Sequence, residues 1–329
     1  MNLTQVARKA RVSTATVSRV INDRQVVSTT TRTRVLKAIK ALNYYPDAHA
    51  RLLSAGVCRT LGLVVSNMEN PFFLDICRVL EREAQSHGYE VLLANAEYDS
   101  QGLNSSAQMM LGHRLAGLAL VASEIEQALL EQLDERKIRT VVCDARVPIG
   151  SILSLKTNYK TGIHRLVEYL RSLGHRKMAF VGHRAGPGQL SERENTVVMV
   201  LNSFDVQFTA VAESEGYVGG RRAARQLFST GPKPSAILCI NDFMAIGALR
   251  ELRDMGLSVP RDVSVAGFDG ISLSEFIYPS LTTLHIPGER IGRWIFDSLT
   301  APETKLQRLQ GFVLEPVLVV RESTGLAPR

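Results

Sequence analysis

The sequence predicts a small all-α head followed by a larger α/β domain, and three observations support this. In the first 45 residues, apolar side chains recur at helical spacing in three short segments. From residue 60 onward, short apolar runs alternate with helical stretches, as is typical of parallel sheets covered by helices on both faces. The charge is also divided: residues 1–59 hold eleven basic and two acidic side chains, a net charge of +9, whereas the rest carries −2.

Three helices are predicted for the head. Asn2, Ser13 and Ser28 are residue types that cap helix N-termini, and each precedes an apolar pattern of helical period. A short break is expected at Arg11 and Val12, between the first two helices. The side chains expected to pack inward are Leu3, Val6, Ala7, Ala10, Val17, Val20, Ile21, Val35, Leu36, Ile39 and Leu42.

The second predicted helix leaves a polar face with short side chains near its start. Thr14 can hydrogen-bond a base, Ala15 can contact a thymine methyl group, and Arg19 can reach a guanine or a phosphate. Short side chains let the start of a helix approach base edges in the major groove. Three-helix units also occur without DNA, and a solvated basic face is the alternative. The concentration of positive charge in this unit favours a polyanion, most simply nucleic acid.

The runs VARKARVSTATVSRVIND and VVSTTTRTRVLKAIKALNYYPDAHARLL resemble the DNA-binding head of the lactose-repressor/galactose-repressor (LacI/GalR) family. One departure is Arg11, because the family usually has Gly in this turn. The resemblance implies a helix-turn-helix DNA-binding domain over 1–45, a hinge helix and linker over 46–58, and an effector-binding and dimerisation domain over 59–329. The implied DNA-binding residues are Thr14, Ala15, Thr16, Ser18, Arg19, Asn22, Ser28, Arg32, His49 and Leu53.

Leu53 has a specific implied role in the hinge. By resemblance it is a wedge that enters the minor groove at the centre of an operator, and the alternative is a packing residue in a linker. One head reads few base pairs, so we expect a homodimer on a pseudo-palindromic duplex.

The resemblance extends over essentially the whole chain. It implies a periplasmic-binding-protein-like α/β sensor domain of two doubly wound lobes. Lobe one is expected over about 60–158 and 288–316, and lobe two over about 159–287 and 317–329. The expected strands are 61–65, 90–94, 117–121, 140–143, 178–181, 236–240 and 263–268.

Parallel sheets of this kind bind ligands outside the carboxyl ends of their strands. Asn70 also lies at such an end, where a simple helix-starting turn is the alternative, and we expect Asp242 to be a helix cap. The residues expected to bind the effector are Phe72, Phe73, Asp144, Arg193, Asn241 and Asp269.

The sequence predicts the residues that bind the effector more clearly than it predicts the effector itself. Glu215, with Tyr217 two residues on, stands near a position where the family often has an aromatic residue. Glu215 argues against a strongly anionic effector and Arg193 argues for one, which leaves the charge open. A sugar or sugar derivative acting as inducer of a repressor is expected. The alternative is a corepressor-dependent regulator that senses a nucleobase, nucleoside or phosphorylated metabolite.

Several other classes of protein are disfavoured. The sequence lacks the phosphate-loop, H-E-x-x-H and G-x-S-x-G motifs, so we expect neither an enzyme nor a cofactor. The four cysteines lie far apart, which favours reduced buried thiols over a metal site. Without a secretory signal or a long apolar run, a cytoplasmic protein is expected rather than a membrane protein or a transport receptor.

Overall fold

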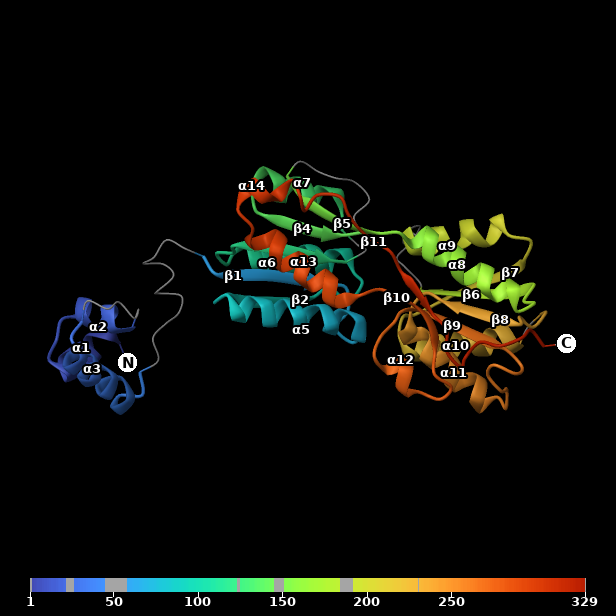
Figure 1. Cartoon of the computed structure of the whole chain (residues 1–329), viewed down its shortest axis with the longest axis horizontal. Helices are drawn as coiled ribbons and strands as arrows, with labels where there is room; N and C mark the ends of the chain where they lie inside the picture. Colours follow the sequence, from blue (N-terminus) through green and yellow to red (C-terminus); the bar gives the residue numbers. More distant parts are fainter. Residues whose placement is uncertain are drawn as a thin grey trace. The chain divides into compact units, whose positions relative to one another are not determined.

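The computed structural model describes residues 2–21, 27–44, 58–122, 125–144, 151–183, 192–229 and 231–328. The chain divides into two compact units, Met1–Arg59 and Thr60–Arg329 (Figure 1). The first unit is helical, and the second contains two six-stranded sheets, each with its own helices. This arrangement confirms the predicted fold class.

The head consists of α1 (Leu3–Ala10), α2 (Thr14–Ile21) and α3 (Thr29–Ala41). Each helix starts at a predicted cap. The Asn2 side chain accepts from the Gln5 N–H at 3.1 Å, and the Gln5 side chain accepts from the Asn2 N–H in return. Ser13 Oγ accepts from the Thr16 N–H at 3.1 Å. Ser28 Oγ accepts from the Thr31 N–H at 3.4 Å.

A small apolar core joins the three helices of the head. Its buried members are Val6, Ala7, Ala10, Val17, Val20, Val35 and Ala38. The expectation for Leu36 is wrong, because this side chain is 50% exposed. Successive helical residues are rotated by about 100°, so Leu36 lies off the face on which Val35 and Ala38 pack. Ala38 takes the inner position instead.

The first lobe is built on a parallel sheet with the strand order β11-β5-β4-β3-β1-β2. Its strands are β1 (Thr60–Val65), β2 (Glu90–Asn95), β3 (Gly117–Val121), β4 (Thr140–Cys143), β5 (Leu153–Thr157) and β11 (Phe312–Leu314). Its helices are α5 (Pro71–Ser86), α6 (Ser100–Leu111), α7 (Gln127–Glu135), α13 (Gly288–Thr300) and α14 (Glu303–Leu306). Helix α13 returns from the second lobe and packs on α5 (Figure 1).

The second lobe repeats this plan with the strand order β12-β10-β9-β8-β6-β7. Only β12 runs antiparallel to its described neighbour, β10. The strands are β6 (Lys177–His183), β7 (Gln207–Glu213), β8 (Ala236–Cys239), β9 (Ser264–Asp269), β10 (Thr282–His285) and β12 (Val317–Val319). The helices are α8 (Tyr159–Ser172), α9 (Glu192–Ser203), α10 (Tyr217–Ser229), α11 (Asp242–Asp254) and α12 (Leu273–Phe276).

The strand order determines where a ligand site can form. Among the described elements, the chain passes from one sheet to the other three times, after β5, β10 and β11. In each sheet the order reverses at one point, between β1 and β3 in lobe one and between β6 and β8 in lobe two. Crevices outside the carboxyl ends of strands at such reversal points are the usual ligand sites of doubly wound sheets.

Candidate functional site

The exposed face of α2 extends from its first turn to Arg19 in its last turn. Thr14, Ala15 and Arg19 are exposed, whereas Val17 and Val20 are buried in the head core. No acidic side chain occurs among the described residues of the head. A basic surface with small side chains at a helix start is the arrangement that reading of the major groove requires.

Hydroxyl groups form local hydrogen bonds at the starts of α2 and α3. Ser13 Oγ lies 2.9 Å from Thr16 Oγ1. Ser28 Oγ donates to Thr31 Oγ1 at 3.0 Å at the start of α3. Of the other residues expected to contact DNA, Ser18 and Arg32 are half-buried, and Asn22, His49 and Leu53 lie outside the described residues.

Arg11 has an unusual backbone conformation in the turn between α1 and α2. Its φ and ψ are 53° and 50°, in the left-handed region that glycine adopts readily. Its N–H closes the end of α1 by donating to the Ala7 and Arg8 carbonyls. The departure from the family pattern at this position is therefore a side chain placed where the backbone favours glycine.

Side chains from both lobes meet at the carboxylate of Glu215, which follows β7. Its Oε1 accepts hydrogen bonds from the Tyr98 hydroxyl at 2.5 Å and from Asn70 Nδ2 at 3.4 Å, both in lobe one. In lobe two, Asn241 Nδ2 donates to the same oxygen at 2.6 Å. Burial raises the pKa of Glu215 to about 7, and the hydrogen bond from Tyr98 partly opposes this. One carboxylate thus bridges the two lobes.

Arg193 and Asp269 form a buried ion pair in lobe two. Arg193 Nη1 donates to Asp269 Oδ1 and to the Ile240 carbonyl, both at 2.9 Å. The guanidinium carbon lies 5.1 Å and 4.5 Å from the ring centroids of Tyr159 and Phe268, so cation–π contacts add to the ion pair. Burial raises the pKa of Asp269 to about 6, although the charge of Arg193 lowers it.

Asp144 lies at the carboxyl end of β4 and is held by groups of the protein itself. Its carboxylate accepts from the Thr157 N–H at 2.6 Å, from Thr157 Oγ1 at 3.1 Å, and from the Tyr159 hydroxyl. Burial raises its pKa, which the Tyr159 bond partly offsets. These contacts secure the passage from β5 to α8, where the chain enters lobe two.

Asn241 and Asp242 differ in function at the start of α11. Asn241 is the N-cap and accepts from the Met244 N–H at 2.8 Å, so the expectation that Asp242 is the cap is wrong. Asp242 is fully buried, and burial raises its pKa to about 7. Its carboxylate accepts from the Gly270 N–H, the Ile271 N–H, Ser274 Oγ and Thr283 Oγ1. It therefore ties α11 to β9 and β10.

Aromatic rings line the lobe-one side of the junction. Phe73 is nearly buried, and its ring centroid lies 5.4 Å from that of Phe72 and 6.5 Å from that of Tyr98, with edge-on geometry in both pairs. Tyr217 is 39% exposed and packs edge-on against Phe243 at 4.2 Å. Glu215, and not an aromatic residue, occupies the position that bridges the two lobes. Tyr217 lies on α10.

The structure brings the six predicted effector-binding residues, together with Asn70 and Glu215, to this junction. Sequence reasoning missed Tyr98, Tyr159 and His183. The Tyr98 ring lies 5.5 Å from that of His183 across the lobes. Tyr98 and His183 lie near the ends of β2 and β6, so the strand-end rule applied to every strand would have found them. Tyr159 lies two residues after the end of β5, but β5 was not among the strands expected from the sequence, so the rule could not have reached it.

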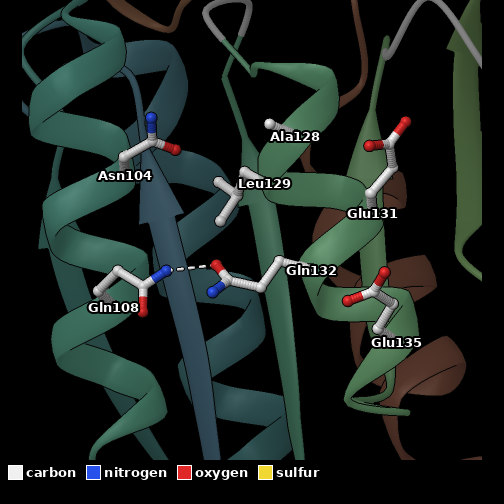
Figure 2. Close-up of a pocket in the computed structure, with 7 residues that line it drawn as sticks. All are labelled: Asn104, Gln108, Ala128, Leu129, Glu131, Gln132 and Glu135. Carbon is white, nitrogen blue, oxygen red and sulfur yellow. Dashed lines mark hydrogen bonds between the residues drawn. The ribbon is translucent and has the colours of Figure 1, made fainter.

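A surface hollow of about 560 Å³ lies elsewhere, between α6 and α7 (Figure 2). Its lining contains both polar and apolar side chains, and Gln108 Nε2 donates to Gln132 Oε1 across it at 2.5 Å. Its lining residues include none of those that meet at the lobe junction. This hollow is thus separate from the candidate ligand site.

The described residues contain neither a metal-binding cluster nor a helix that could span a membrane. No group of three or more His, Cys, Asp and Glu side chains there is arranged to hold a metal ion. No helix in the described ranges is long and apolar enough to cross a membrane.

The fold and the exposed α2 surface define a helix-turn-helix protein with a two-lobed ligand-binding domain. Residues 2–47 match the bacterial regulatory proteins of the lacI family, and residues 167–324 match the periplasmic binding protein-like domain. The chain belongs to the lacI family and is a DNA-binding transcription regulator.

The similarity extends over nearly the full chain. The HTH-type transcriptional repressor PurR of Erwinia tasmaniensis is 34% identical, with 98% of this chain and 96% of that protein covered. The ribose operon repressor of Escherichia coli is also 34% identical, with 97% and 98% covered. A crystal structure of the Lac repressor dimer bound to operator and an anti-inducer has a TM-score of 0.81 and 25% identity, with 99% of each chain covered.

Proposed function

We propose that this protein is a repressor whose affinity for operator DNA is controlled by a small molecule bound between its two lobes. The observation that carries this proposal is the Glu215 network, which joins Asn70 and Tyr98 of one lobe to Asn241 of the other. A ligand that enters this junction must replace or rearrange contacts between the lobes. Ligand binding and lobe closure are therefore coupled.

For DNA binding, we propose that the exposed face of α2, from its first turn to Arg19 in its last turn, reads bases. Thr14, Ala15 and Arg19 supply the contacts to base edges, and Arg32 and the hydroxyl groups near the helix starts add contacts to phosphates. The proposed divisions are a DNA-binding domain over 1–45, a hinge over 46–58 that carries the wedge Leu53, and a sensor over 59–329. Two copies bind a pseudo-palindromic site as a homodimer, since one head reads too few base pairs.

For the effector, we propose the residues gathered at the lobe junction. They are Asn70, Phe72, Phe73, Tyr98, Asp144, Arg193, Glu215, Asn241 and Asp269. Backbone strain at this junction supports the assignment: Tyr98, Asp144 and Asp269 have positive φ values of 55°, 56° and 105°. Such conformations persist only where surrounding contacts impose them, and they cluster at ligand sites.

The direction of control has two candidates. An inducing sugar or sugar derivative comes first, because the carboxylates at the junction are suited to accept hydrogen bonds from hydroxyl groups. A corepressor such as a nucleobase, nucleoside or phosphorylated metabolite comes second. We further propose that the protein acts in the cytoplasm, because its operator DNA is located there. We also propose that it catalyses no reaction.

The test begins with operator selection from random duplexes, followed by a thermal-shift screen of sugars, sugar phosphates, nucleosides and amino acids. A junction ligand should raise the melting temperature by mass action and change operator affinity about 5- to 150-fold. The Arg193→Ala and Asp269→Asn variants should lose the shift. A ligand that raises the melting temperature without changing operator affinity would contradict the sensor assignment.

A further inference from the structure

The two oxygens of the Glu215 carboxylate have unequal surroundings. The Tyr98 hydroxyl, Asn70 Nδ2 and Asn241 Nδ2 all donate to Oε1. Oε2 is buried, and no described residue donates a hydrogen bond to it. A buried carboxylate oxygen without a donor is unfavourable, because it has lost its hydration and gained nothing in return. Within the described part of the chain, the junction therefore lacks one donor at a defined atom.

The charges around Glu215 are also unbalanced. The described junction holds the carboxylates of Asp144, Glu215 and Asp269 but only the guanidinium of Arg193. His183 and Glu194 pair with each other at 3.8 Å. Asp269 raises the pKa of Glu215 through charge repulsion, in addition to the larger effect of burial. Among the residues that the structure describes, positive charge is what this part of the site lacks.

The positive charge of Arg193 is not available to a bound anion. Its guanidinium already donates to Asp269 and to the Ile240 carbonyl, and two aromatic rings lie within about 5 Å of it. An anionic effector would compete with Asp269 for Arg193 and would meet the charge of Glu215. The sequence alone left the charge of the effector open. Because Arg193 is already paired with Asp269, the structure disfavours an anionic effector.

We propose that Glu215 is the specificity residue of the junction and that it selects an effector bearing a protonated amine, most simply an amino sugar. The inference rests on the proposed function of the junction as an effector site. The ammonium group donates to Oε2 and neutralises the carboxylate, while hydroxyl groups of the same molecule use the remaining acceptors. A neutral hydroxyl group at this position would supply the hydrogen bond but leave the charge buried.

The experiment uses the full-length protein and matched probes. Glucosamine, galactosamine and mannosamine are each compared with the parent sugar, its N-acetylated amine and its 6-phosphate, by calorimetry and thermal shift near neutral pH. At least one amine should bind about tenfold or more tightly than its parent, the gain typical of a charge-assisted bond. Acetylation, which removes the charge, should abolish the preference.

Two variants separate this role from a structural one. Glu215→Gln keeps the shape of the side chain and removes its charge, so it should bind amine and parent alike while still folding. Glu213→Gln is the matched control, because Glu213 ends β7 and accepts from the neighbouring Ser214 N–H at 3.3 Å. It should retain the preference of the wild type.

The outcomes are distinct. Tightest binding by a phosphate or a neutral sugar, an amine preference that survives Glu215→Gln, or no amine-dependent binding would overturn the proposal. If a neutral sugar binds at least as tightly as its amine and changes operator affinity, the proposed function stands while the Glu215 inference fails. If an amine binds through Glu215 without changing operator affinity, the inference stands and the sensor function fails.

Discussion

At the scale of single residues, Arg11 shows how backbone conformation limits stability. A non-glycine residue in the left-handed region costs about 1 kcal/mol relative to glycine. Arg11→Gly should therefore stabilise the head by about 1 kcal/mol, measured by hydrogen exchange of the α1 and α2 amides in the full chain. Arg8→Gly is the control, because Arg8 lies inside α1, where glycine should cost about 1 kcal/mol. Changes of the same sign would contradict this account.

Glu215 should make stability depend on pH. Its pKa in the folded chain is raised to about 7, above the usual value of 4.5. The folded state therefore holds the proton where the unfolded state has lost it. The contribution of this group is complete below about pH 4.5 and is lost as the pH rises through 7.

Glu215→Gln removes this loss and leaves a neutral group in its place. The variant should gain stability relative to the wild type between about pH 5 and pH 8, on the order of 2 kcal/mol. Denaturant unfolding at the two pH values measures the difference. Asp242 and Asp269 titrate in both proteins, so their contributions to the pH dependence of stability largely cancel when the two proteins are compared. A stability difference that is independent of pH would show that Glu215 is ionised throughout.

At the scale of elements, the surface of α2 determines DNA recognition. Arg19→Ala should weaken operator binding by about 1–3 kcal/mol and relax the preference for one base, since a side chain in the groove carries sequence information. Selection from a randomised duplex measures both effects. Arg8→Ala, on the exposed surface of α1, should change affinity without changing the selected sequence. Unchanged selectivity in Arg19→Ala would remove Arg19 from base reading.

The start of α11 depends on Asp242 for its attachment to β9 and β10. Asp242→Ala leaves buried donors from three segments without an acceptor and should cost about 3 kcal/mol or more. The control is Asp254→Ala at the end of α11, where solvent screens the exposed pairs with Arg221 and Arg250, so the loss should be much smaller. Equal losses in chemical denaturation would mean that Asp242 is not a structural anchor.

At the scale of the whole molecule, charge and symmetry determine affinity. Two copies of residues 1–59, each with a net charge of +9, should bind DNA mainly through phosphates. Operator binding should fall at least about tenfold between 50 and 200 mM salt, as measured by fluorescence anisotropy. Sedimentation should show a dimer at micromolar concentration. A monomer, or binding insensitive to salt, would contradict the proposed mode of DNA binding.

The sequence by itself determined the head and the class of fold. Caps such as Asn2 and Ser28 act within three residues, and apolar stripes repeat over one or two helical turns, so both can be read locally. The buried strands β1, β3 and β4 are continuous apolar runs, which can likewise be read from neighbouring residues. The concentration of positive charge in residues 1–59 also needs no structure to be seen.

The tertiary structure alone decided which polar groups meet. Tyr98 and Glu215 are 117 residues apart, and no local pattern relates them. Asp242 has the local appearance of a cap, but its partners lie 28 to 41 residues further on. The strand β7 is partly exposed and lacks a continuous apolar run, and β12 is an apolar run of only three residues, so pairing with β6 and β10 defines them. Packing between distant segments, which local spacing does not encode, turns these residues into a site.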